Sequence, residues 1–216
     1  MALKKIRTTN GYDIEMVKAV EFLDHMGDDN AVCDAARVSF DKSSTEYSPE
    51  ANQRLLRYLA EHDHWSPFAH CSMKFRFQAP MFIARQFQKH VVGFAWNEVS
   101  RRYVSSDPSF FVPESWRQRP DNMHDILDNY VGQMRGHAKD YKVMMNQNIC
   151  PEQARMCMPQ SMMTEWIWTG SLMAWARFIK LRGDSHAQAE CWQYADAVSE
   201  EMYHYFPAAS AALLGE

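Results

Sequence analysis

Residues 71–90 read CSMKFRFQAPMFIARQFQKH, and the spacing of their apolar side chains changes at Pro80. Before the proline, apolar and polar residues alternate, which is the pattern of a strand with one buried face. After the proline, the apolar residues fall on one side of a helix, and proline is favoured in a first helical turn. The stretch therefore predicts a strand over residues 71–78 followed by a helix over residues 80–90.

The polar side of this predicted helix suits a phosphate-bearing ligand. Arg85 and Lys89 are four residues apart, as are Gln86 and His90, so a helix would place them in two adjacent columns. The segment 97–103 follows with the sequence NEVSRRY. Arginine forks, a lysine charge and serine hydroxyls are groups that bind phosphate. Periodicity alone leaves a second interpretation open, in which these residues are a solvated helix face beside a charged loop.

The remaining sequence predicts one mixed domain with several helices. No repeat, low-complexity tract or Gly/Ser linker interrupts residues 1–216, so we expect a single domain of the α+β class. Residues 91–103 are expected to form a loop with some extended structure. Helices are predicted over residues 49–62, 125–146, 152–158 and 161–181, and over residues 185–206 from the S-x-x-Q capping pattern at Ser185.

The composition argues against several classes of protein. The formal net charge of −4 at pH 7 argues against a nucleic-acid binder, which would need a basic surplus. No apolar run reaches the roughly 20 residues that a membrane span needs, and residues 1–7 lack the apolar stretch of a secretory signal, so we expect a cytoplasmic protein. The five cysteines are scattered and include no C-x-x-C pair, which predicts reduced thiols.

Two further groups of polar residues have alternative interpretations. His62, Asp63 and His64 contain one His-Asp dipeptide, but a zinc or phosphohydrolase site needs three or four converging ligands. No distant partner is evident, so we expect no metal site. Arg155 and Arg182 each adjoin apolar helix positions. Each arginine either extends past its apolar neighbours to water or contacts an anion or a pyrimidine.

With these motifs in place, the chain resembles the flavin-dependent thymidylate synthases, the ThyX family. The segments that carry the resemblance are AARVS at 35–39, HWSPFAH at 64–70, APMFIARQ at 79–86, NEVSRRY at 97–103, E-x-A-R at 152–155 before Pro159, and LR-x-x-SHAQ-x-E at 181–190. They follow the order of the family's motifs over roughly residues 30 to 200. A collinear set of this kind is far more specific than any single motif.

The resemblance implies both a fold and a reaction. The expected fold has a small, mostly antiparallel sheet and several long helices, assembled as a homotetramer whose sites take residues from several chains. The expected reaction is the reductive methylation of dUMP to dTMP, with carbon from 5,10-methylenetetrahydrofolate and hydride from FAD that NADPH has reduced. The family uses no covalent cysteine, and no cysteine of this chain follows a proline. Positioning and electrostatics would then have to supply the rate.

The resemblance also implies roles for single residues. Arg182 would lie near the pyrimidine and stabilise the negative charge that develops on it. The nucleotide dUMP would be bound by Arg182 together with Gln86, Glu98, Val99, Ser100, Arg101, Arg102 and Arg155. FAD would be contacted by Ser39, Ser66, Lys89, His90, Asn97, Glu98, Ser171, Arg177 and His186.

The chain departs from the family signature in the segment assigned to the flavin. Lys89-His90-Val91 stands where the family has R-H-R, and one extra residue lies before Asn97. One cation of the signature is therefore absent, and the other is the point charge of a lysine in place of a planar guanidinium. Ser171 and Arg177 occupy positions where the family has asparagine.

Three other functions remain open at this point. One is a metal-dependent nucleotide phosphohydrolase built on residues 62–64. Another is a member of the resembled family that binds FAD or dUMP with little turnover. The third is an RNA-binding module that stacks bases on aromatic rings such as Trp96 and Tyr103.

Overall fold

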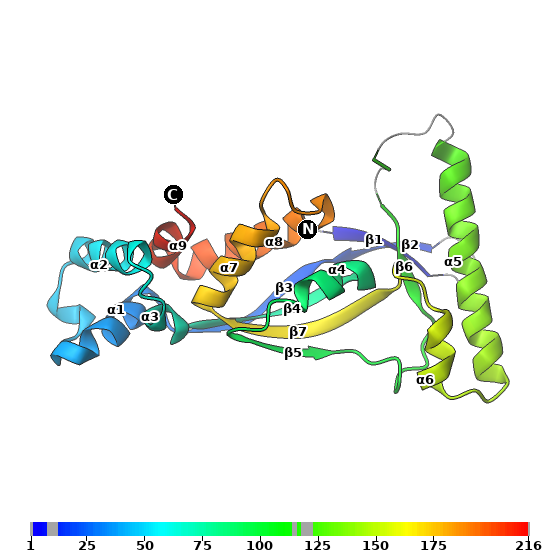
Figure 1. Ribbon diagram of the computed structural model, residues 1–216, viewed down its shortest axis with the longest axis horizontal. Helices are drawn as coiled ribbons and strands as arrows, with labels where there is room; N and C mark the ends of the chain where they lie inside the picture. The colour runs from blue at the N-terminus through cyan, green and yellow to red at the C-terminus, as the bar shows by residue number, and fades with distance from the viewer. Residues whose placement is uncertain (1, 8–12, 114–115, 118–122, 216) are drawn as a thin grey trace.

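The computed structural model describes residues 2–7, 13–113, 116–117 and 123–215. The body is elongated and contains two antiparallel sheets (Figure 1). The larger sheet has the strand order β3-β4-β7-β5, formed by Val20–Met26, Ser72–Pro80, Met163–Ser171 and Phe94–Glu98. The smaller sheet has the order β2-β1-β6, formed by Asp13–Lys18, Ala2–Arg7 and Ser109–Phe111. The α+β class with antiparallel sheet is therefore confirmed, with two sheets where one was expected.

The pairing of β4 with β7 forms the centre of the larger sheet. Their register sets Phe75 opposite Trp168 and Phe77 opposite Trp166, and all four side chains are buried. The rings of Phe77 and Trp166 are stacked with their centroids 5.2 Å apart. Because side chains alternate along a strand, Arg76 lies on the opposite face, where it forms ion pairs with partly exposed glutamates.

Helices α4 (Met81–Phe87), α7 (Leu172–Arg182) and α8 (Ala189–Tyr205) cover the aromatic face (Figure 1). The Phe77 ring contacts Phe87 of α4, Phe178 of α7 and Tyr194 of α8, with centroid separations of 6.2, 6.4 and 6.1 Å. Burial of one such large side chain contributes roughly 1.5–3 kcal/mol. Helix α4 follows β4 directly and α7 follows β7 directly, so two neighbouring strands place their helices on the same face.

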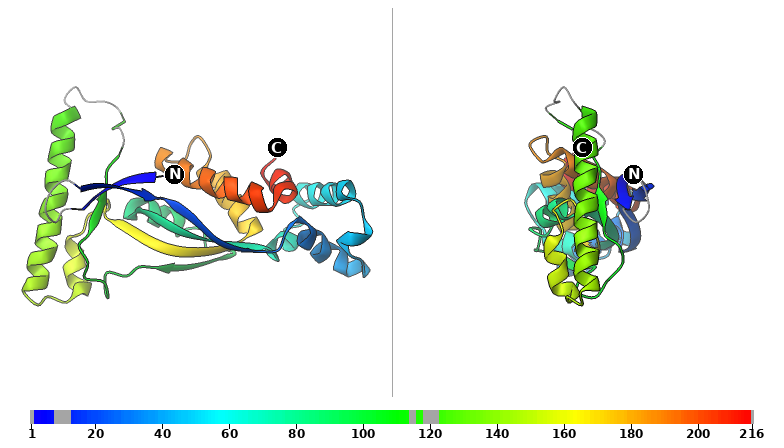
Figure 2. Two further views of the ribbon diagram at one scale, coloured as in Figure 1. Left: turned by 180° about the vertical axis from the view of Figure 1, so that it is seen from behind. Right: turned by 90° about the vertical axis from the view of Figure 1, so that its right-hand side faces the viewer.

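The remaining elements gather at the two ends of the body (Figure 2). One end holds α1 (Asp29–Arg37), α2 (Pro49–Glu61), α3 (Ser66–Ala69), α9 (Pro207–Leu214) and the 3₁₀ turns Val38–Phe40 and Ser44–Glu46. The other end holds the smaller sheet, α5 (Met123–Asn146), α6 (Pro151–Ala154) and the 3₁₀ turn Arg155–Cys157. Among the described residues, no helix has both the length and the apolar character that a membrane crossing requires.

A carboxylate connects α1 to α9 at the first of these ends. Asp29 accepts hydrogen bonds from the backbone N–H groups of Ala208 and Ala209, at 2.8 and 2.9 Å. These groups open α9 and have no partner within the helix, so Asp29 serves as its cap. Burial raises the pKa of the Asp29 carboxyl above its ordinary value, and the two backbone hydrogen bonds act in the opposite direction.

The helix predicted over residues 161–181 is wrong in its first half. Residues Met163–Ser171 form β7, and only the following residues are helical, as α7. Trp166, Trp168 and Gly170 are buried and alternate with partly exposed residues, which is the period of a strand. The sequence could not settle the matter, because a short apolar run does not by itself distinguish a strand from a buried helix.

Helix α4 is shorter than the helix predicted over residues 80–90. It ends at Phe87, so Lys89 and His90 lie beyond it, and the two polar columns expected there do not form. Pro80 is the N-cap of α4 and the last residue of β4, in place of a first-turn residue. Extended backbone at the proline lets the strand lead straight into the helix.

The predicted helix over residues 185–206 begins later than expected. Helix α8 begins at Ala189 with Gln188 as its N-cap, so the capping box predicted at Ser185 is wrong. The helices predicted over residues 49–62 and 125–146 are confirmed as α2 and α5. The short helix predicted over 152–158 is present as α6 and the 3₁₀ turn that follows it.

Two glycines should respond to alanine in opposite directions. A Cβ atom at Gly170 would overlap the Phe94 ring and lie 3.0 Å from the Trp175 indole nitrogen. Gly170→Ala should therefore lower the free energy of unfolding by about 1–3 kcal/mol. A Cβ atom at Gly136 in α5 would meet nothing within 4 Å, so Gly136→Ala should raise the free energy of unfolding by up to about 1 kcal/mol. Urea denaturation checks both, and a stabilised Gly170→Ala variant would contradict the packing.

Candidate functional site

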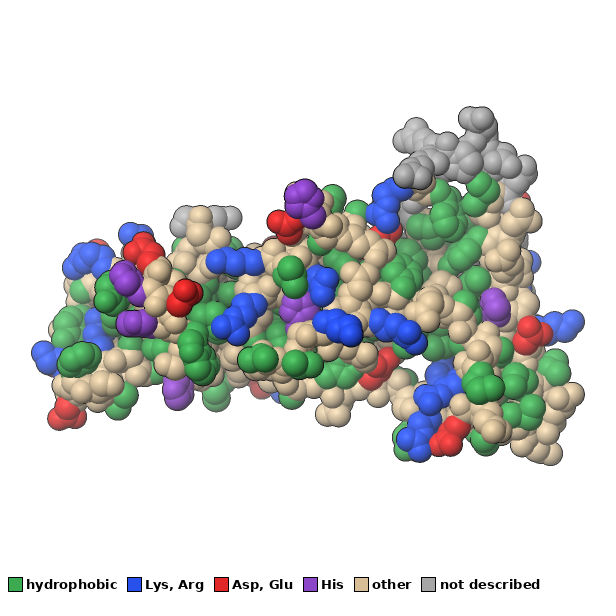
Figure 3. Space-filling view, in the orientation of Figure 1, with side chains coloured by type: hydrophobic (Ala, Val, Ile, Leu, Met, Phe, Trp, Pro, Cys, Tyr) green, Lys and Arg blue, Asp and Glu red, His purple; other side chains and the backbone are tan. Residues whose placement is uncertain are grey.

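The end of α7 meets the end of α4 through Arg182. Its Nε donates to Nε2 of His90 at 2.9 Å, and its Nη2 donates to the backbone carbonyl oxygen of Gln86 at 2.7 Å. We call Gln86, His90 and Arg182 the Arg182 centre. Figure 3 shows Lys and Arg side chains spread across the face that carries α4 and α7, with few acidic ones among them.

Both acceptors that hold Arg182 are uncharged. Burial, and secondly the neighbouring Arg182 cation, lowers the pKa of His90 from its ordinary value of 6.5 to about 4. The ring is therefore neutral at pH 7, as its role of acceptor from Arg182 requires. Within the described residues Arg182 has no carboxylate partner, so its positive charge is fixed in place without being neutralised.

A second centre is a pocket of about 940 Å³, which we call the arginine pocket. It brings together residues assigned to dUMP from two distant segments: Glu98, Val99, Ser100, Arg101 and Arg155. Arg102 lies at the same place, because its Nε donates to the Glu152 carboxylate at 2.6 Å and Nε of Arg155 donates to the Glu152 carbonyl at 3.2 Å. The arrangement gathers guanidinium groups around a cavity large enough for a nucleotide.

The pairs that hold these arginines are exposed. The side chains of Arg102 and Glu152 are about half accessible, at 48% and 51%. An ion pair open to water is weak, so an incoming phosphate can compete with Glu152 for Arg102. Arg101 is turned toward the backbone carbonyls of Ser106 and Asp107.

Within one chain, the Arg182 centre and the arginine pocket are separate sites. Arg182 and Gln86 are not among the residues that line the arginine pocket, whereas Arg85, the neighbour of Gln86 on α4, does line it. Helix α4 therefore contributes consecutive residues to two separate places. The residues assigned to dUMP are collected in two groups within one chain.

The residues assigned to FAD are more widely spread. Ser171 and Arg177 line a pocket of about 470 Å³ together with Gly93 and Trp65. The Ser171 hydroxyl accepts from the N–H of Ala174 at 3.2 Å and caps α7. Ser39, Ser66, Lys89, Asn97 and His186 are exposed on other segments, while His90 belongs to the Arg182 centre. Glu98 accepts from the Thr164 hydroxyl at 2.6 Å and lines the arginine pocket.

Several polar residues of these pockets were not assigned by the sequence. Lys5 of β1 lines the arginine pocket, beside Arg85, which the sequence had indicated only as a general phosphate-binding group. Glu190 lines a third pocket, together with Phe82 of α4. No motif pointed to Lys5, because its strand contributes to the pocket only through tertiary pairing. Within the described part of the chain, no group of three or more His, Cys, Asp or Glu side chains is placed to hold a metal ion, residues 62–64 included.

The neutral state of His90 gives a prediction about pH. Its pKa of about 4 lies below the value of 6.5 expected in the unfolded chain, so the unfolded state binds the proton first. The neutral His90 therefore contributes fully to the free energy of unfolding above pH 6.5, and this contribution is lost as the pH falls toward 4. In a ¹³C-histidine NMR titration, with His90→Asn for assignment, the His90 signal should not titrate between pH 5.5 and 8. Arg182→Met should raise the His90 pKa part of the way, and a His90 midpoint near 6.5 in the wild type would contradict the burial.

Most of the chain is similar to known proteins. A protein-family model described as "Thymidylate synthase complementing protein" matches residues 21–208. A flavin-dependent thymidylate synthase of Thermosipho africanus is 35% identical over 189 residues, 82% of each chain. One of Kosmotoga olearia is 34% identical over 209 residues, 90% of this chain and 89% of that one.

A solved structure agrees with the sequence comparisons. The UMP/dUMP methylase PolB from Streptomyces cacaoi, bound with 5-Br dUMP, has a TM-score of 0.80 and 26% identity to this chain. The match covers 91% of this chain and 94% of that one. With the family match spanning both centres, and relatives more than 30% identical over most of the chain, the protein belongs to the flavin-dependent thymidylate synthase family.

Proposed function

We propose that the chain converts dUMP to dTMP, with carbon from 5,10-methylenetetrahydrofolate and with FAD and NADPH as the redox cofactors. The observation that carries the proposal is the arginine pocket, in which residues 98–101 and Arg155 come together from distant segments. The similar structure of PolB was solved with 5-Br dUMP, which supports a uridylate as the substrate class.

The arginine pocket suits the phosphate and sugar of the nucleotide. Arg102 and Arg155 can each present a planar fork to phosphate oxygens, and the Ser100 hydroxyl can donate beside them. Glu152 holds both arginines in the free protein. A phosphate that replaces the exposed Glu152 carboxylate would find its cationic partners already oriented, which reduces the entropy cost of binding.

Arg182 suits the role of stabilising charge on the pyrimidine. Its two acceptors are neutral, so its positive charge remains available to a ring that gains negative charge during the reaction. Two hydrogen bonds also fix the plane of the guanidinium before substrate arrives. In many enzymes a preorganised charge of this kind accelerates the reaction more than any other effect, because the charge need not reorient in the transition state.

The donor set near α7 suits FAD. The Ser171 hydroxyl and the Arg177 guanidinium can donate to phosphate oxygens, and the exposed Trp65 ring beside Ser66 offers an apolar surface. We assign Ser39, Ser66, Lys89, His90, Asn97, Glu98, Ser171, Arg177 and His186 to this cofactor. When bound, FAD supplies the hydride that completes the methyl group.

We also propose a homotetramer, in which one chain supplies the Arg182 centre and another an arginine pocket. Large apolar side chains are exposed next to the assigned segments: Val91 at 69%, Tyr103 at 77%, Met156 at 76% and Leu181 at 56%. Exposed apolar side chains of this size suggest contact surfaces, and closed symmetric assembly is the common way to cover them. Association would bring the two groups of dUMP residues together.

The reaction itself should be directly measurable. Purified protein supplied with FAD, NADPH, 5,10-methylenetetrahydrofolate and dUMP should release the C5 hydrogen as tritiated water and form dTMP. The protein should show flavin absorption. Omission of dUMP or NADPH is the control, and a protein that takes up no FAD and forms no dTMP would refute the proposal.

Replacement of Arg182 should separate flavin binding from turnover. Arg182→Ala should keep the bound flavin but lower kcat about 100-fold or more, the usual loss for a preorganised charge. Arg182→Lys should recover only part of this rate, because lysine is a point charge that lacks the planar fork of the guanidinium. Arg54→Ala, an exposed arginine on α2, is the matched control. Unchanged kcat in Arg182→Ala would remove the role assigned to Arg182.

A further inference from the structure

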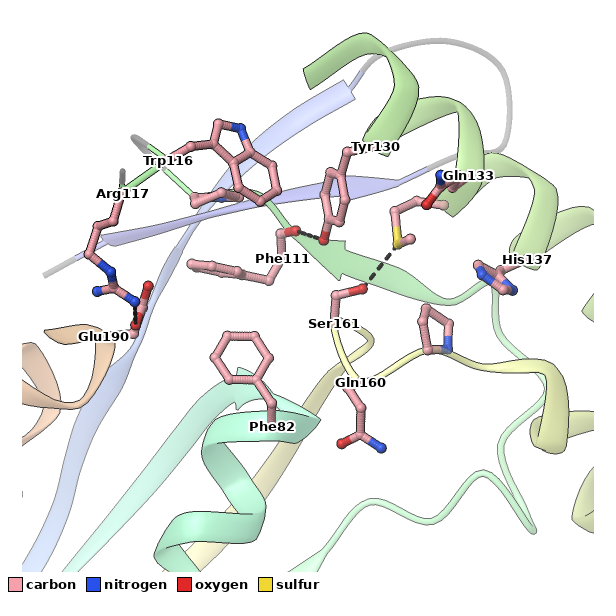
Figure 4. A pocket seen from close by; sticks show the side chains of 13 residues that line it. Phe82, Phe111, Trp116, Arg117, Tyr130, Gln133, His137, Gln160, Ser161 and Glu190 are labelled. Atoms are coloured by element: carbon pink, nitrogen blue, oxygen red, sulfur yellow. Dashed lines mark hydrogen bonds and ion pairs between the residues drawn. The ribbon is translucent and has the colours of Figure 1, made fainter. Parts of the chain in front are cut away.

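A row of hydrogen bonds extends outward from the side chain of Gln86. Gln86 Nε2 donates to Gln188 Oε1 at 2.6 Å, and Gln188 Nε2 donates to Glu190 Oε2 at 2.8 Å. Arg117 Nη2 donates to the same Glu190 oxygen at 2.9 Å. Figure 4 shows the outer end, where Arg117 and Glu190 face each other at the edge of an aromatic pocket. We call Gln86, Gln188 and Glu190 the amide row.

The hydrogen bonds of the amide row fix the orientation of the Gln86 and Gln188 side-chain amides. An ionised carboxylate can only accept hydrogen bonds, so Glu190 requires the nitrogen end of Gln188. The oxygen end of Gln188 then faces Gln86 and requires the nitrogen end of Gln86. A terminal amide on its own has two nearly equivalent orientations, and here the charge of Glu190 selects one of them through Gln188.

The state of Glu190 supports this role. Burial by itself would raise the pKa of the Glu190 carboxyl, but hydrogen bonds from Gln188 and Arg117 together hold it below its ordinary value. Glu190 is therefore ionised at neutral pH. Its side chain is 22% exposed, whereas that of Arg117 is 57% exposed, so the inner part of the row is shielded and the outer ion pair is open to water.

The other end of Gln86 retains bonding capacity. Its Nε2 has a second acceptor in the Phe82 carbonyl at 3.4 Å, so both amide hydrogens have partners in the chain. Its Oε1 lies 3.7 Å from the Cys191 thiol, which is a weak donor. The oxygen can therefore accept from an N–H or O–H group of a bound nucleotide.

We propose that Gln188 and Glu190 are positioning residues for dUMP, which hold the side chain of Gln86 in one orientation, while the backbone carbonyl of Gln86 accepts from Arg182. The inference rests on the proposed function, because it takes Gln86 as a dUMP contact. Neither residue needs to touch the nucleotide. Arg117 contributes little, because an exposed ion pair is weak.

The test is dUMP affinity, measured by isothermal titration calorimetry on the FAD-loaded protein. Glu190→Gln keeps the shape of the side chain but can donate as well as accept, so Gln188 is no longer restricted to one orientation. It should raise the dUMP Kd about tenfold, the size of one lost hydrogen bond. Gln188→Met should do the same, and Arg117→Ala should stay within about twofold. Glu200→Gln, an exposed glutamate on the same helix, should leave the Kd unchanged.

A double-mutant cycle separates positioning from a general structural effect. With Gln86→Ala as the background, Glu190→Gln should cause no further loss of dUMP affinity, because the group that it orients is absent. The KM for dUMP should rise in Glu190→Gln with kcat nearly unchanged, and the melting temperature should stay close to that of Glu200→Gln.

The outcomes distinguish this inference from the proposed function. Wild-type protein that binds no dUMP refutes the proposed function. Wild-type protein that binds dUMP, with an unchanged Kd in both Glu190→Gln and Gln188→Met, refutes the amide row alone. If the losses of dUMP affinity in Gln86→Ala and Glu190→Gln are additive in the double mutant, the amide row is also refuted, because Glu190 would then act on affinity without Gln86.

Discussion

The antiparallel pairing of β4 with β7 is the constraint on which the site depends. Each strand leads without a loop into a helix, β4 into α4 and β7 into α7, so the register of the strands sets the position of the helices. The stacked rings of Phe77 and Trp166 are buried beneath these helices. The ends of α4 and α7 then lie close enough for Arg182 to bond to Gln86 and His90. The close-packed interior has low compressibility, so it holds the ends of α4 and α7 at a fixed separation.

The arginines of the two centres are held in different ways. Arg102 has a carboxylate partner in Glu152, and the pair is exposed. Arg182 has uncharged partners and is half-buried. An exposed pair can release its arginine to a phosphate, whereas an unneutralised and fixed guanidinium acts best on charge that develops during a reaction. The local environment therefore suits one arginine to binding and the other to catalysis.

The elongated shape of the body explains why the residues assigned to dUMP and FAD form several separate groups within one chain. Ser39 lies at the end that holds α1, and Arg155 at the end that holds α5 (Figure 1). Ser39 is assigned to FAD and Arg155 to dUMP, so a single elongated chain keeps these two parts of the proposed site at opposite ends. Exposed apolar residues beside the assigned segments, such as Tyr103 and Met156, offer surfaces through which further copies could complete the site.

The sequence by itself determined the class of fold, β4 and α2, and the family, because these follow from local periodicity and from motif order. It failed where local pattern is ambiguous: the pattern predicts a helix where β7 forms, and a helix that carries His90 where α4 ends at Phe87. The neutrality of His90, the separation of Arg182 from Arg155, and the row from Gln86 to Glu190 were decided by tertiary structure alone. These features depend on burial or on contacts between segments about a hundred residues apart. The spacing of neighbouring residues encodes neither burial nor such distant contacts.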